Sequence, residues 1–360
     1  MRKQLIFLCV ILILSAITLS PSFLAWQVAK DRIRLTLDTS EAEEVLYILK
    51  LRQDGKSVGD GAWQKLFGTE PYQRLKKREA QMGQSRHDSQ LGFTDDDFKK
   101  FVLSDDALKR AADLQAILDQ WKKVNLRASA ERVLQYLPDQ ATIRAKVFPV
   151  IKPRPNSFVF ETDTDPAIFL YLDPGESPAK FENTVAHELH HIGLGSLGPV
   201  YDKKIAGLPE RAGQAAIWMG AFGEGLAMLA AAGGPDIDPH AASSAEERLR
   251  WQHDLANFES DLEAVNEFFV DALSGTLPNK EAVDQKAFSF FGVQGPWYTV
   301  GYRMAVIVEK RFGRRILIDT MLDPRQLLLL YNRAATELNA AHKESLPLWS
   351  GQMLKQCVGS

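Results

Sequence analysis

The sequence predicts a mostly helical α+β protein. Apolar residues recur three and four positions apart through most of the chain, which is the period of a buried helix face. Only a short central part differs: residues 141–151, 157–160 and 167–173 carry β-branched and aromatic runs separated by turn residues, a pattern typical of strands. Helical patterns precede and follow these strands. The order is therefore helices, a small sheet and more helices, not the alternation of an α/β fold.

The helices expected before the sheet are amphipathic. They cover residues 41–52, 105–124 and 129–137. Polar stretches at 53–61 and 81–97 are rich in Gly, Gln, Asp and Ser, and these predict loops. We therefore expect a helical N-terminal region over residues 27–137 and a second domain over 138–360, which contains the sheet and the later helices.

The N-terminal segment, residues 1–26, has the layout of a secretory signal. A basic pair, Arg2 and Lys3, precedes a long uncharged apolar run. A cleaved signal peptide needs an apolar stretch of roughly 7–15 residues, whereas the run through 5–26 approaches the roughly 20 residues that span a bilayer. Signal peptide and retained signal anchor are both open. In either case we expect an exported, periplasmic or otherwise extracytoplasmic protein, because the basic residues stay inside.

Composition narrows the possible functions. The formal net charge of −3 and the lack of a long basic run argue against nucleic acid as a partner. Of the two cysteines, Cys9 lies in the N-terminal segment and Cys357 lies near the C-terminus. The exported part is therefore expected to have no intramolecular disulfide, and its stability must come from core burial.

The most informative stretch is ENTVAHELHHIGLGSL, residues 182–197. On a helix that turns 100° per residue, His187, Glu188 and His191 share one polar side, and the apolar residues of 183–192 occupy the other. The i, i+4 spacing lets two imidazoles converge on one metal ion. Glu188 then lies beside the ion, where it can act as general base on a metal-bound water. The pattern predicts a zinc site with one Zn²⁺ per chain.

Other residues of this stretch have less certain roles. Gly193 and Gly195 are expected to end the helix. His190 could compete as an i, i+3 partner of His187, but it is expected to support the ligands from behind, to line the substrate cleft, or simply to face solvent. The competing interpretation of the whole stretch is an ordinary polar helix face.

A catalytic zinc takes a third protein ligand and keeps one position open. Glu224 is the only charged residue in MGAFGEGLAMLAAAGG, residues 219–234, and a charge in such apolar surroundings needs a partner. Gly223 and Gly225 on either side would let this backbone approach the histidine helix closely. The alternative is a capping glutamate at a helix start. The fallback ligands are Glu210 and Glu259.

These residues carry a family resemblance. TVAHELHH (184–191) followed by FGEGLA (222–227) resembles the gluzincin type of zinc metallopeptidase. More narrowly, the chain is similar to a poorly characterised group of bacterial zinc-dependent peptidases, in which a third region has an aromatic residue followed by Gly-Tyr. Here that region is WYTVGYRMA, 297–305. The resemblance covers about 170–310.

The resemblance implies a zincin-like metallopeptidase domain with the small sheet before the histidine helix. It implies zinc bound by His187, His191 and Glu224, with Glu188 as catalytic base. One position departs from the pattern: thermolysin-like gluzincins have an Asp four residues after the ligand Glu, and Met228 stands there in this chain. The residue that orients the ligand imidazoles is therefore unassigned.

Attack on a peptide carbonyl creates an oxyanion that needs a hydrogen-bond donor. Tyr298 and Tyr302 are i, i+4 neighbours after a helix start expected at Gly295-Pro296, and either phenol could donate; Tyr302 is preferred because it belongs to the resembling Gly-Tyr pair. Arg303 could bind a substrate carboxylate. The alternative for all three is packing and solvation.

The strand at 167–173 directly precedes the histidine helix and could be an edge strand that pairs with an extended peptide. Its unbroken apolar character favours a fully buried strand instead. The glycine-rich segment 193–209 could form a cleft wall or lid.

Taken together, these observations predict a zinc metallopeptidase acting on a peptide or protein substrate. Two alternatives stay open. One is a zinc amidase acting on cell-envelope material, and the other is a non-catalytic exported helical binding protein with a structural zinc. Glu188 distinguishes the last from an enzyme, because a protein without catalysis does not need the base.

Overall fold

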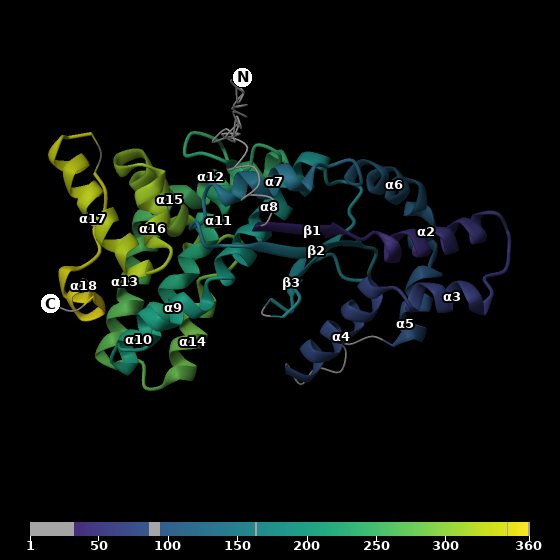
Figure 1. The fold of residues 1–360 in the computed structure, drawn as a ribbon, viewed down its shortest axis with the longest axis horizontal. Helices are drawn as coiled ribbons and strands as arrows, with labels where there is room; N and C mark the ends of the chain where they lie inside the picture. The colour runs from purple at the N-terminus through teal and green to yellow at the C-terminus, as the bar shows by residue number, and fades with distance from the viewer. Residues whose placement is uncertain (1–31, 86–93, 163, 344, 359–360) are drawn as a thin grey trace, which may run out of the picture.

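A computed structural model describes residues 32–85, 94–162, 164–343 and 345–358 (Figure 1). The predicted signal peptide or anchor, 1–26, lies outside the described residues. Figure 1 shows an elongated arrangement in which the early helices gather at one end, the late helices at the other, and the sheet lies between them. The described part is mostly helical with four strands, which confirms the α+β prediction.

The strands are β1 (Ile33–Leu37), β2 (Ile143–Val150), β3 (Phe158–Phe160) and β4 (Ala167–Tyr171). They form one sheet in the order β1-β2-β4-β3. β1 and β4 each pair parallel to β2, and β3 pairs antiparallel to β4. The three strands predicted from the sequence are confirmed within a few residues at each end.

Two expectations about strands are wrong. Residues 33–37 form β1, although the region from 27 to 137 was expected to be helical; the short IRLTL run alternates buried and more exposed side chains, which is a strand pattern. The possible edge strand at 167–173 is interior, because β4 has β2 on one side and β3 on the other. The buried strand that the apolar sequence favoured is therefore confirmed, and over residues 167–169 both edges of β4 are paired.

Three helices before the sheet, α2, α6 and α7, correspond to the predicted segments, whereas α3, α4 and α5 were not predicted as separate helices and extend into the predicted loops 53–61 and 81–97. They are α2 (Ser40–Gln53), α3 (Asp60–Phe67), α4 (Glu70–Ser85), α5 (Asp95–Val102), α6 (Asp105–Trp121) and α7 (Leu126–Leu134). α5 and α6 begin where Thr94 and Ser104 accept hydrogen bonds from backbone N–H groups of the first turn.

The remaining chain is helical. It contains α8 (Pro178–Gly195), α9 (Gly198–Ile205), α10 (Glu210–Met219), the 3₁₀ turn η1 (Gly220–Phe222), α11 (Gly223–Ala232), α12 (Ala245–Ala256), α13 (Phe258–Ser274), α14 (Lys280–Ser289), α15 (Pro296–Phe312), α16 (Arg314–Thr320), α17 (Pro324–Ala340) and α18 (Gly351–Val358).

Both faces of the sheet are covered. Along β2 and β4, Val147, Ile168 and Leu170 belong to one apolar core, and Phe148 and Phe169 belong to a smaller cluster under α4. This alternation follows from the period of two along a strand. It explains why the sequence of β4 is apolar throughout.

The described chain has two large apolar cores. The first core contains side chains from Ile33 to Leu197, together with Ala231, and the second contains Tyr136 with side chains from Ala215 to Cys357. Leu194 near the end of α8 packs against both. The first core includes residues on both sides of position 137/138. The division into 27–137 and 138–360 stays a prediction about domains.

One described stretch, Glu210–Ala232, is long and apolar enough to cross a membrane by length and composition alone. Of its most apolar 18 residues, 67% are buried within the protein. Its apolar character is accounted for by this packing, since α11 lies between α8 and α15.

Candidate metal centre

α8 carries the histidine motif, and it is held in place by its N-terminal cap and by the burial of its apolar side chains. Ser177 accepts a hydrogen bond from the backbone N–H of Lys180, and Pro178 occupies the first turn, so the helix starts well before the motif. The apolar side chains of the helix are buried in the first core, as predicted.

The expectation that Gly193 ends the helix is wrong, because α8 continues to Gly195. A Cβ at Gly193 would lie 2.3 Å from Cδ1 of Leu137. The glycine therefore allows α8 to pack closely on the segment that follows α7. This contact sets the distance between α8 and the segment that contains Leu137.

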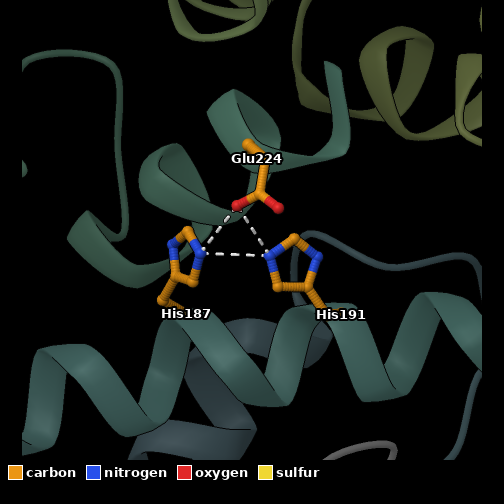
Figure 2. Close-up of side chains that lie close together, drawn as sticks. All are labelled: His187, His191 and Glu224. Atoms are coloured by element: carbon orange, nitrogen blue, oxygen red, sulfur yellow. Dashed lines mark hydrogen bonds and ion pairs between the residues drawn. The ribbon is translucent and has the colours of Figure 1, made fainter. Parts of the chain in front are cut away.

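His187 and His191 stand one turn apart on the same face of α8, and Glu224 reaches them from α11 (Figure 2). The two Nε2 atoms are 3.0 Å apart. Oε2 of Glu224 is 3.2 Å from Nε2 of His187 and 3.1 Å from Nε2 of His191. Among the described residues, these are the three side chains grouped closely enough to share one metal ion.

Glu224 does not cap a helix. α10, η1 and α11 follow one another without a break, and the residue before α11, Phe222, has helical backbone angles and makes no side-chain cap. Glu224 instead turns its carboxylate toward α8. A 3₁₀ turn inside a longer helix often marks a functional position, and here it directly precedes the carboxylate.

The close approach expected of Gly225 is made to a different helix. A Cβ at Gly225 would lie 1.9 Å from the backbone N of Tyr302, and one at Gly301 would lie 2.6 Å from the carbonyl oxygen of Phe222. α11 and α15 therefore touch backbone to backbone. A Cβ at Gly223 would make only an ordinary contact with Leu194 of α8, at 3.9 Å.

The carboxylate of Glu224 and the imidazole of His191 shift each other's pKa values. Burial would raise the pKa of Glu224, but the facing imidazoles of His191 and His187 hold it well below its usual range. Burial opposes a charged His191, and the Glu224 carboxylate nevertheless raises the pKa of His191 to about 9. Glu224 is thus an anionic donor, and a metal ion must displace protons to bind.

The three donor atoms fit a zinc ion. Zinc–nitrogen and zinc–oxygen distances of about 2.0–2.2 Å put the corners of a tetrahedron roughly 3.3–3.6 Å apart. The measured separations of 3.0 to 3.2 Å need to widen by only a few tenths of an ångström. Two imidazoles and one carboxylate are a donor set typical of catalytic zinc.

Glu188 is half-buried on the same side of α8. Its charge contributes to raising the pKa values of both His191 and Tyr298, so it lies close to the cluster. Within the described chain it has no hydrogen bond or ion pair. Its oxygens are therefore available to a water molecule or a substrate.

Of the two candidate tyrosines, Tyr298 lies beside the cluster. Its ring is nearly parallel to the imidazole of His187, at 13° with centroids 6.4 Å apart. Burial and then the Glu224 and Glu188 carboxylates raise the pKa of Tyr298 above its usual range. The phenol thus keeps its proton and can donate it in a hydrogen bond.

Tyr302 lies one turn further along α15 and has other neighbours. Its ring meets the edge of Trp251, with centroids 5.4 Å apart, and its pKa is raised to about 12 by burial and by Asp238. As a hydrogen-bond donor close to the cluster, Tyr298 is therefore the better candidate, whereas the sequence pattern favoured Tyr302. Only the tertiary packing of α15 could distinguish them, because both lie on one helix face.

The solvent-facing alternative for His190 is wrong. The side chain is fully buried, and neither ring nitrogen makes a hydrogen bond of good geometry within the described chain. Burial, with the neighbouring His191 and His187, lowers the pKa of His190 to about 3 and keeps the ring neutral. His190 packs behind the ligands and does not face the cleft.

The other candidates lie away from the cluster. Glu210 and Glu259 are exposed, and neither joins the group of possible ligands. Arg303 lines a separate hollow that also contains Glu259. Met228, at the position of the thermolysin-like Asp, is buried in the second core. No described residue donates to or accepts from Nδ1 of His187 or His191.

Comparison with known proteins agrees with this centre. A family model described as "Putative zinc dependent peptidase (DUF5700)" matches residues 63–340. The match includes the three clustered side chains, Glu188 and both tyrosines. No curated protein and no solved structure matches the chain.

Proposed function

The chain belongs to the DUF5700 family, whose description is "Putative zinc dependent peptidase", and from this membership we propose that it hydrolyses peptide bonds with one zinc ion held by His187, His191 and Glu224. The observation that carries the proposal is the convergence of these three donor atoms from α8 and α11. The proposal includes a zincin-like arrangement of the sheet and the histidine helix.

Each nearby side chain has a role in this proposal. Zinc, when bound, would supply a Lewis acid that polarises a carbonyl and lowers the pKa of water. Glu188 takes a proton from the attacking water and gives it to the leaving amine. Tyr298 donates a hydrogen bond to the oxygen of the former carbonyl as it gains charge.

The setting of the reaction is also a proposal. The N-terminal segment supports an exported, extracytoplasmic enzyme, with membrane anchoring through residues 5–26 if the signal is retained. The partner is then a peptide or protein substrate outside the cytoplasm, and no nucleic acid is involved.

The metal is tested by measuring zinc per chain by elemental mass spectrometry after dialysis. We expect about one zinc in the parent protein and strongly reduced zinc in Glu224→Ala. Glu210→Ala is the matched control, because this exposed glutamate precedes the same helical stretch and should leave zinc content unchanged. Equal zinc in both variants would exclude Glu224 as a ligand.

Catalysis is tested separately with Glu188→Gln, which removes the base and keeps the shape. We expect this variant to retain zinc and to lose roughly 10²–10⁴-fold in hydrolysis of a mixed peptide library, the range for a general base. Unchanged hydrolysis in a zinc-loaded Glu188→Gln protein would overturn the assigned role.

A further inference from the structure

A cavity of about 270 Å³ opens beside the metal cluster, and His191 forms part of its wall. We call this cavity the His191 pocket. It lies between the end of α8, α9, the stretch from α10 through η1 to α11, and the turn that joins α16 to α17. Its walls include Leu194, Tyr201, Ile217, Met219, Phe222 and Leu322.

Apart from the imidazole of His191, which the proposed metal ion would occupy, the walls are apolar and carry no carboxylate, ammonium or guanidinium group. The two hydroxyl groups are already engaged, since Tyr201 donates to the carbonyl of Ala216 and Thr320 to that of Leu317. A charged or strongly polar occupant would lose its hydration without finding partners. An apolar occupant would gain from burial.

The size of the pocket suits one large side chain. An apolar protein cavity of about 150 Å³ is enough to bind benzene. At about 270 Å³ the His191 pocket has room for an aromatic or a branched aliphatic side chain. Small side chains such as Ala would leave much of it empty and would gain less from burial.

The mouth of the pocket also fits an apolar ligand. Ile217 lines it from α10 and is 55% exposed. Such an exposed apolar group beside a cavity can be covered when a ligand binds.

We propose that the His191 pocket selects the substrate, by receiving the side chain of a bulky apolar residue directly next to the bond that is cleaved. The adjacency follows because His191 is both a proposed zinc ligand and a wall of the pocket. The enzyme would thus cleave peptides beside Phe-like or Leu-like residues. This inference rests on the proposed function for its cleavage step, whereas the pocket's preference for apolar groups does not.

The first test measures binding without catalysis. Full-length protein is mixed with N-acetyl-phenylalanine amide, N-acetyl-leucine amide or N-acetyl-aspartate amide, with and without zinc, and binding is followed by saturation-transfer NMR. We expect the two apolar probes to bind at least tenfold more tightly than the aspartate probe. Equal binding of all three, or of none, would overturn the inference.

Gly195→Leu is the variant that should close the pocket. Gly195 lines the pocket four residues after His191, hence on the same helix face, and helical side chains lean toward the N-terminus. A Cβ there meets no atom within 4 Å, so the helix should fold normally. We expect this variant to lose the apolar probes. Gly61→Leu, at an equally open helical glycine in α3, is the matched control and should bind them normally.

A second pair of variants uses charge. Ile217→Asp places a carboxylate at the mouth and should weaken the apolar probes at least tenfold. Leu249→Asp, on α12 and 67% exposed, makes the same change outside the pocket and should have no effect. Because both positions are exposed, misfolding is not expected to explain a difference. A similar loss in both variants would contradict the pocket assignment.

The second test sequences the products of a peptide library by mass spectrometry. Cleavage next to Phe, Leu, Met or Tyr, lost in Gly195→Leu and retained in Gly61→Leu, supports the inference. Cleavage without that preference overturns it and leaves the proposed peptidase function intact. If no peptide is cleaved while the apolar probes still bind selectively, the proposed function fails and the pocket's apolar selectivity stands.

Discussion

Single side chains in the centre differ in how closely they are tied to the metal cluster. Tyr298 lies beside His187, whereas Tyr302 packs on Trp251 and faces Asp238. Both carry the same phenol on the same helix face. The difference arises because α15 crosses α11 at Gly225 and Gly301, and this crossing sets which turn of α15 reaches the site.

Replacing Tyr298 with Phe is therefore expected to lower kcat by roughly 100-fold with little change in KM, as for loss of one oxyanion donor. Tyr302→Phe should have a much smaller effect on kcat, because its ring packs against Trp251 and the charges that shift its pKa, led by Asp238, lie outside the cluster. Steady-state kinetics on one cleaved peptide would check this. A larger loss in Tyr302→Phe would restore the preference drawn from the sequence.

A second single-residue effect concerns pH and stability. Glu41 is fully buried at the start of α2, accepts a hydrogen bond from the N–H of Ile151, and has its other oxygen unpaired. Burial raises the pKa of Glu41 to about 8, although the Ile151 bond and the charge of Lys152 oppose the shift. The folded protein therefore holds a proton that the unfolded chain releases near its ordinary value of 4.5.

Because the pKa of Glu41 is higher in the folded protein than in the unfolded chain, its contribution to the free energy of unfolding depends on pH. That contribution is fully present below about pH 4.5 and is lost as the pH rises through about 8. Glu41→Gln keeps the acceptor without the charge. We expect it to be more stable than the parent by a few kcal/mol at pH 9, with little difference at pH 4.5, in urea unfolding at both values. Glu43→Gln, an exposed carboxylate of α2 paired with Lys122, should show no such gain.

At the scale of elements, the centre depends on three helices in contact. α8 carries His187, His191 and Glu188, α11 carries Glu224, and α15 carries Tyr298. Glycines allow the tightest contacts, at Gly193 with Leu137 and at Gly225 with the backbone of α15. Gly225 thereby sets the distance between α11 and α15, which carry Glu224 and Tyr298.

Gly225→Ala is expected to destabilise the protein by about 3 kcal/mol or more, because the added methyl would overlap the backbone of α15. It should also reduce zinc binding, since Glu224 is the preceding residue. Thermal unfolding and zinc content would measure both effects. Gly213→Ala in α10, where the nearest atom is 4.0 Å from the added Cβ, should instead be neutral or slightly stabilising.

Considered as a whole molecule, the protein holds its centre between two apolar cores. The apolar side of α8 belongs to the first core, and α11 contributes mainly to the second. A metal ion bound by His187, His191 and Glu224 therefore links the two cores. Packing of α8 against α11 brings Glu224 to His191, which lies 33 residues earlier in the chain.

A bound zinc ion should consequently stabilise the fold. At a zinc concentration of about 100 times Kd, binding contributes about 2.7 kcal/mol, which corresponds to a rise in Tm of several degrees. Calorimetry with and without a chelator would measure it, and Glu224→Ala should show little zinc response. An unchanged Tm in a protein shown to bind zinc would mean that the ion does not link the cores.

The sequence by itself determined the helical class, the three later strands, and the pairing of His187 with His191. These are local properties: they follow from residue periodicity and from the fixed 3.6-residue turn of one helix. Glu224 was also predictable, as a lone charge in an apolar helix, although its contact with α8 was not a local property.

The tertiary structure alone decided the rest. The pairing of β1 with β2, the interior place of β4, the burial of His190 and the turn of α15 at the cluster each join segments far apart in the chain. The His191 pocket likewise has walls from separate parts of the sequence, and neither the histidine motif nor FGEGLA by itself indicates a cavity. Such features depend on how helices pack against one another, and packing is set by shape complementarity that periodicity does not encode.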